Sequence, residues 1–148
     1  MDRRNIFRAT LAAIAGAVAT RASADTDAKS TAVPKVVYHL ADAEKVNFVL
    51  GNIKNHIEGM GGPDKVTIAL VVHGPALRAF QNSSSDAELK SKVANVSKTG
   101  VGLHACVNTM RGMNITLSDL QPGFVVADKG GVVRLADLQQ QGYVYLRP

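Results

Sequence analysis

The sequence predicts one α/β domain, built on an open, parallel, five-stranded sheet with helices on both of its faces. Short apolar runs rich in β-branched residues alternate with segments whose apolar residues recur at helical spacing. The run KVTIALVVHG at 65–74 is apolar almost without interruption, which is typical of a strand buried on both faces of a parallel sheet. The chain has 148 residues, the size of a single domain.

The first strand and the first helix follow each other directly. KVVYHL at 35–40 is short and partly β-branched, so it is predicted to be a strand. Asp42 can cap the helix that follows. The apolar residues of that helix recur three or four positions apart from Val46 to Met60, and the Gly- and Pro-rich stretch 59–63 ends it.

The second strand leads into one or two predicted helical turns at 75–80 and a polar loop at 81–86. Ser85 and Glu88 have the spacing of a capping box and predict the start of the second helix, which Gly100 ends. The remaining predicted elements are a strand at 101–107, a loop carrying Arg111, a short turn at 116–120, a strand at 123–128, a helix at 130–141 and a strand at 143–146. This alternation predicts a flavodoxin-like sheet with the strand order 2-1-3-4-5.

The first 24 residues are predicted to be an export signal of the twin-arginine type. They combine the pair Arg3 and Arg4, a small-residue apolar run at 9–20 and the motif ASA at 22–24. Cleavage would leave a polar tether at 25–34 before the domain at 35–148, and would place the protein in the periplasm. The apolar run is shorter than the roughly 20 residues that a membrane span needs, so no stable span is expected after processing. An uncleaved N-terminal anchor is the alternative.

Charge and missing motifs exclude several classes of function. The net charge is +5, of which residues 1–24 contribute +3, and the remaining +2 is too small to predict binding to nucleic acid. The loop LADAEK after the first strand lacks the glycines that hold a nucleotide or flavin phosphate. No cofactor is therefore predicted, and no zinc-finger or HExxH spacing indicates a metal.

Polar side chains are predicted at the carboxyl ends of three strands, where open parallel sheets bind ligands. His39 ends the first strand, and His73 and Gly74 end the second. Cys106 and Asn108 end the third, beside the expected crevice between the first and third strands. In a regular strand, alternation places His104, Cys106 and Asn108 on one face.

Cys106 is the only cysteine, so it cannot form a disulfide within the chain. A nearby imidazolium, an arginine or a helix N-terminus can lower the pKa of a thiol and make it nucleophilic. The candidates for this role, or for binding a substrate, are His39, His73, Gly74, His104, Asn108 and Arg111. Two alternatives stay open at this point: an inert, buried thiol, and a soft metal site made by the histidines and Cys106.

The segments VVYHL, VVHG and above all GVGLHACVNTMRG resemble the DsrE/DsrF-like sulfur-relay family, and PGFVVADKGGVVRLADLQQQGYVYL resembles the C-terminal part of one of its branches. The resemblance covers residues 35–148. It implies a flavodoxin-like fold and a homo-oligomer, a trimer or hexamer. It also implies that Cys106 accepts sulfur as a persulfide from a protein or small sulfur compound and passes it to a partner, as a sulfur carrier or sulfurtransferase. The alternative is a non-catalytic oligomer or a metal- or ligand-binding module with the same fold.

Overall fold

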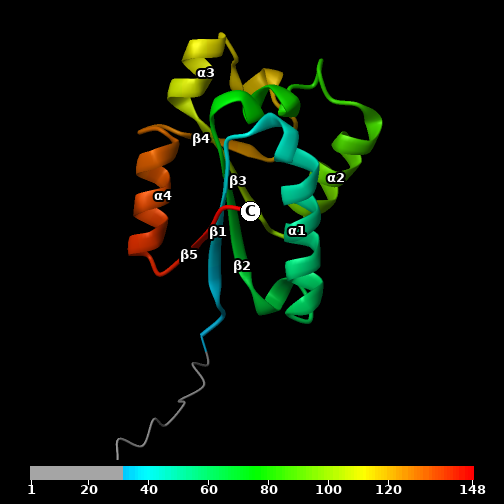
Figure 1. Ribbon diagram of the computed structural model, residues 1–148, viewed down its shortest axis with the longest axis vertical. Helices are drawn as coiled ribbons and strands as arrows, with labels where there is room; N and C mark the ends of the chain where they lie inside the picture. Colours follow the sequence, from blue (N-terminus) through cyan, green and yellow to red (C-terminus); the bar gives the residue numbers. More distant parts are fainter. Residues whose placement is uncertain (1–31) are drawn as a thin grey trace, which may run out of the picture.

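The computed structural model describes residues 32–148, which form a five-stranded sheet in which every neighbouring pair is parallel (Figure 1). The predicted export signal lies outside the described residues and stays a prediction. The strands are β1 (Lys35–Leu40), β2 (Thr67–Val72), β3 (Gly102–Cys106), β4 (Phe124–Ala127) and β5 (Val144–Leu146). The open parallel α/β sheet predicted from the sequence is confirmed.

The strand order, however, is 4-3-2-1-5, and the predicted order 2-1-3-4-5 is wrong. The chain adds β2, β3 and β4 stepwise on one side of β1 and then crosses back to place β5 on the other side. As a result β2 separates β1 from β3, and the predicted crevice between the first and third strands does not exist. The predicted order placed the second strand at an edge and the fourth inside the sheet, whereas β2 lies at the centre of the sheet and β4 at an edge.

Helices cover the two faces of the sheet unequally (Figure 1). The helices α1 (Val46–Gly59) and α2 (Ala87–Lys98) lie on one face, and α4 (Gly131–Gln140) lies on the other. This division follows from the strand order, because right-handed crossovers that run in opposite directions along a sheet lie on opposite faces.

The two faces also differ in the size of their cores. The core under α1 and α2 is the larger one and includes Leu50, Leu70 and Phe80. The core under α4 has five buried members, which are Val37, Ala69, Val71, Leu135 and Leu138. Valines near it stay open to solvent, with Val125 50% and Val132 71% exposed. The predicted homo-oligomer stays a prediction.

Two predictions of local structure are corrected. The segment after β3 is a helix, α3 (Val107–Met113), where a loop was expected. The second helix is capped by Asp86, whose Oδ1 accepts the Leu89 N–H at 2.7 Å. Ser85 instead donates its hydroxyl to backbone carbonyl oxygens in the preceding turn. The short 3-10 helices are η1 (Ala43–Lys45), η2 (Pro63–Lys65), η3 (Gly74–Phe80) and η4 (Leu117–Asp119). Within residues 32–148, no helix is both long enough and apolar enough to cross a membrane.

Candidate functional site

The carboxyl ends of the three central strands bring three of the predicted side chains to one edge of the sheet. His39 comes from β1, His73 follows β2 directly, and Cys106 is the last residue of β3. Their neighbours in sequence Tyr38, Val72 and Ala105 belong to the core under α1 and α2. Strand alternation therefore turns His39, His73 and Cys106 toward the face covered by α4.

Cys106 is buried, with 6% of its surface exposed, and it is the residue that caps the start of α3. Burial raises the pKa of the thiol, but hydrogen bonds to the sulfur outweigh burial and bring the pKa below its ordinary value. The donors are the backbone N–H groups of Thr109, Gly131 and Asn108, together with the Thr109 hydroxyl. Of the three predicted routes to a lower pKa, the one that acts on Cys106 is the approach of backbone N–H groups from the starts of two helices, α3 and α4.

Thr109 joins two strand ends at the thiol. Its Oγ1 accepts the backbone N–H of Gly74 at 2.9 Å, and its hydroxyl hydrogen is then free to point to the sulfur of Cys106. Gly74 adopts a φ of 60°, a left-handed conformation that glycine reaches at little cost. Gly74 therefore contributes to the site through its backbone, by positioning Thr109.

The start of α4 approaches the thiol so closely that residue 131 has to be small. A Cβ on Gly131 would lie 3.2 Å from the Cβ of Cys106, 3.3 Å from the Cβ of His73 and 3.6 Å from the sulfur. His73 and Cys106 therefore flank the same point of the backbone. Asn108 packs in a similar way against Gly130, where a Cβ would lie 2.7 Å from its Nδ2. Asn108 lies in α3 rather than at the end of a strand, and its backbone N–H is what reaches the sulfur.

The two histidines form a hydrogen-bonded chain with Tyr145 of β5. The rings of His39 and His73 stack with their centroids 4.6 Å apart, and their Nε2 atoms are hydrogen-bonded to each other. The Tyr145 hydroxyl is 2.5 Å from Nδ1 of His39. All three groups are satisfied if Tyr145 donates to His39 and the Nε2–H of His39 donates to His73.

Both imidazoles are neutral at neutral pH. Burial, with contributions from His73 and from Arg147, lowers the pKa of His39 to about 4, and Asp42 opposes this shift. Burial also lowers the pKa of His73, again with a contribution from Arg147. Neither histidine supplies the positive charge that was one of the predicted ways to stabilise a thiolate.

His104 and Arg111 lie apart from this cluster. His104 lies on the α4 face of the sheet, as Cys106 does, but its Nε2 contacts Nη2 of Arg134 at 3.5 Å. Burial and the charge of Arg134 lower the pKa of His104 to about 4. Arg111 is exposed on α3, and within residues 32–148 its side chain makes no hydrogen bond or ion pair. The expected role of Arg111 at the thiol has no contact to support it.

Metal binding finds no support in this geometry. Among residues 32–148, no three side chains of His, Cys, Asp or Glu lie close enough together to hold a metal ion. The four residues considered for a soft metal site divide into the pair His39 and His73, the separate His104, and Cys106 with its own donors.

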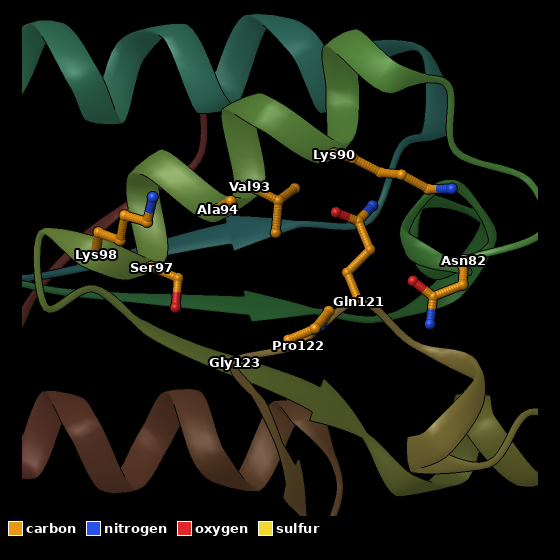
Figure 2. Close-up of a pocket in the computed structure, with 9 residues that line it drawn as sticks. All are labelled: Asn82, Lys90, Val93, Ala94, Ser97, Lys98, Gln121, Pro122 and Gly123. Carbon is orange, nitrogen blue, oxygen red and sulfur yellow. The ribbon is translucent and has the colours of Figure 1, made fainter.

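Two hollows on the opposite face are lined by neither cysteine nor histidine. One, of about 390 Å³, lies between α2 and the segment before β4, and Figure 2 shows Gln121 of that segment pointing toward α2. A second, of about 520 Å³, lies between α1 and α2. Their titratable groups are the lysines Lys90, Lys98, Lys54 and Lys92 and the carboxylate of Glu58.

Three participants were not predicted as site residues from the sequence: Thr109, Gly131 and Tyr145. The available signal for Gly131 was the pair of glycines in DKGGVV at the start of a helix, where small size permits close approach. Thr109 could be placed only once 107–113 was known to be helical, because its hydroxyl then returns toward the capping residue. Tyr145 depends on the strand order, which the sequence pattern left open.

Comparisons with known proteins agree with this architecture. The model of the DsrE/DsrF-like family matches residues 35–148. The protein of unknown function MTH1491 from Methanobacterium thermoautotrophicum is similar in structure, with 26% identity and a TM-score of 0.68 over 78% of this chain and 99% of that one. The ychN protein of E. coli, at 15% identity, has a TM-score of 0.60 over 77% of this chain and 99% of its own. A conserved protein of unknown function from Bacteroides thetaiotaomicron, BT1422, has the same identity and TM-score, over 77% of this chain and 94% of its own. No curated protein matches the sequence.

Proposed function

Because this chain belongs to the DsrE/DsrF-like family, we propose that it carries sulfur on Cys106 as a persulfide. The observation that carries the proposal is the set of four hydrogen-bond donors that converge on one thiol at the carboxyl edge of the sheet. A buried cysteine that serves only packing needs no such donors, because a thiol is a weak hydrogen-bonding group. Donors of this kind stabilise a thiolate, which is the nucleophilic form.

The proposed step is a transfer of sulfane sulfur. The Cys106 thiolate attacks the outer sulfur of a polysulfide or thiosulfate, a new S–S bond forms at Cys106, and the old S–S bond of the donor breaks. The donor leaves as a shorter polysulfide or as sulfite with the electron pair of the broken bond. The terminal sulfur of the persulfide keeps the negative charge, and an acceptor thiolate can then remove that sulfur by the same kind of attack.

The test is the mass of the intact protein after treatment with polysulfide or thiosulfate. We expect a species one sulfur atom heavier (about 32 Da) that forms on the native chain and disappears on treatment with dithiothreitol. The matched control is Cys106→Ser, which keeps the size of the side chain and removes the nucleophile.

Two results would contradict the proposal. One is an unchanged mass with both donors while Cys106 in the folded protein still reacts with a chromogenic disulfide. The other is an equal mass increase in the Cys106→Ser variant. A thiol that reacts with neither the donors nor the chromogenic disulfide would favour the alternative of an inert buried cysteine.

A further inference from the structure

A polar pocket lies beside Cys106 on the α4 face of the sheet. Its volume is about 330 Å³, and its lining residues include His104 from β3, Arg134 from α4 and the segment 125–130. Ala127 lines this pocket and is the register partner of Cys106 in the neighbouring strand. Gly130 lines it as well, and the next residue supplies an N–H to the sulfur. The pocket therefore adjoins the thiol through two elements, β4 and the start of α4.

Arg134 brings an unpaired charge to this pocket. Its Nε is buried and has no hydrogen-bond partner, and its Nη2 has only the distant contact with His104 at 3.5 Å. The carboxylates of Asp128 and Asp137 also line the pocket, but no ion pair in residues 32–148 involves them or Arg134. A buried guanidinium N–H without an acceptor is costly, so such a group usually has a partner that it is placed to bind.

His104 is a second side chain of the pocket that can become positively charged when an anion binds. Its ring lies two residues from Cys106 on the same face of β3, which is roughly 7 Å along the strand. Burial and the positive charge of Arg134 keep this imidazole neutral. An anion bound between His104 and Arg134 would offset the positive charge of Arg134. His104 could then take up a proton and donate a hydrogen bond to the anion. Lys129 at the rim adds a further positive charge and offsets that of Asp128.

We propose that Arg134 and His104 bind the anionic end of the sulfane-sulfur donor and hold its outer sulfur toward Cys106. This inference rests on the proposed function and names its substrate class: small donors that carry an oxyanion or a carboxylate. With thiosulfate, the thiolate attacks the outer sulfur, the S–S bond of the donor breaks, and sulfite leaves beside Arg134. The charge is −3 on both sides of this step, and Arg134 offsets the repulsion between the thiolate and the incoming dianion.

A pair of alkylating reagents of equal shape tests the pocket without any sulfur chemistry. Iodoacetate carries the carboxylate that the pocket should bind, whereas iodoacetamide is neutral. The quantity measured is the rate of alkylation of Cys106 by iodoacetate divided by its rate of alkylation by iodoacetamide. In Arg134→Gln, we expect this ratio to fall about fivefold to tenfold. Arg134→Lys should keep most of the ratio, and it also guards against a general effect of the Gln variant on folding. The matched control is Arg78→Gln, which makes the same charge change on η3, whose buried residues belong to the opposite core.

Loading with sulfur gives the second arm and separates the two proposals. The rate of persulfide formation from thiosulfate should fall in Arg134→Gln by a similar factor. The same measurement with cysteine persulfide, whose anionic group is a carboxylate, distinguishes a carboxylate-bearing donor from a sulfur oxyanion such as thiosulfate. If the rate and the alkylation ratio are unchanged in Arg134→Gln, the pocket proposal is wrong and the persulfide proposal stands. If no donor loads Cys106 but the alkylation ratio still depends on Arg134, the pocket binds anions and the persulfide proposal is wrong.

Discussion

At the scale of single residues, the reactivity expected of Cys106 depends on hydrogen bonds and not on a neighbouring cation. His39 has a pKa of about 4, and the pKa of His73 is lowered by burial, so both rings are neutral where most thiols begin to ionise. The donors at the sulfur are three backbone N–H groups and the Thr109 hydroxyl. Backbone donors are fixed by the fold and remain in place at every pH, so the stabilisation of the thiolate does not depend on protonating a histidine.

Thr109→Val tests the contribution of the hydroxyl. The variant keeps the shape of the side chain but removes a donor to the sulfur and leaves the Gly74 N–H without its acceptor. The pKa of Cys106 should rise, and alkylation by iodoacetamide at neutral pH should slow by about threefold to tenfold. The unpaired Gly74 N–H should also lower the free energy of unfolding by about 1–3 kcal/mol.

The measurement is the rate of alkylation as a function of pH, which separates a change in pKa from a change in access. Thr109→Ser keeps the hydroxyl and should restore the wild-type profile. A Val variant whose profile coincides with that of the wild type would show that the hydroxyl does not act on the thiol.

At the scale of elements, two helix starts meet at one strand end. β3 passes into α3 without a loop, so Cys106 is both the last strand residue and the capping residue of the helix. The backbone N–H groups of the first turn of a helix have no partner within the helix, and the capping position faces them directly. α4 crosses the opposite face and brings Gly131 to the same sulfur.

Gly131→Ala tests this second approach. The added methyl group would lie 3.2 Å from the Cβ of Cys106 and 3.3 Å from that of His73, so α4 has to shift away from the sheet. We expect a rise in the pKa of the thiol, slower alkylation, and a loss of about 1–3 kcal/mol in the free energy of unfolding.

Gly51→Ala is the matched control, because Gly51 lies inside α1 with nothing within 4 Å of the position of its Cβ. That change should stabilise the protein by up to about 1 kcal/mol and leave the alkylation rate unchanged. Equal alkylation rates in Gly131→Ala and the wild type would mean that the close approach of α4 does not influence the thiol.

At the scale of the whole molecule, the sequence predicts the class of the fold better than the path of the chain. The predicted bounds of all five strands agree with the observed bounds to within about two residues. The agreement arises because the spacing of apolar residues and the content of β-branched residues are local signals. The strand order depends on which crossovers are made at long range, and no local signal near β4 or β5 encodes that choice. The prediction of a site at the carboxyl edge does not depend on the strand order, because every parallel strand ends at that edge.

The same distinction between local and long-range signals applies to the site. His39, His73 and Cys106 could be placed at strand ends from sequence alone, whereas the neutral state of the two rings depends on burial. The role of Gly131 depends on a contact between α4 and β3, which the pattern does not show. The exposed position of Arg111 depends on the helix α3, which the sequence pattern did not predict.

The buried histidines also give the whole molecule a pH-dependent stability. In the unfolded chain histidines take up protons near pH 6.5, but His39 and His104 of the folded protein do so only near pH 4. Between these values unfolding takes up protons, so the free energy of unfolding falls as the pH falls. From pH 7 to pH 5 we expect a loss of about 1–3 kcal/mol, a figure discounted for the partial exposure of the rings.

Urea unfolding at the two pH values measures this loss. His104→Gln should reduce the difference between them, because one of the titrating groups is then absent. An equal urea midpoint at pH 7 and pH 5 in the wild type would contradict the assignment of these rings as neutral in the folded state.

The pairing of β5 with β1 has a consequence for how the protein is made. Tyr145, which hydrogen-bonds to His39, lies 106 residues later in the chain. A chain emerging from the ribosome with its N-terminus first can assemble β1 to β4 in order, but β1 keeps an open edge throughout that time. The sheet and the histidine chain can close only after β5 has been synthesised. A chain truncated before β5 would therefore retain the buried residues of both cores and lose Tyr145 from the site.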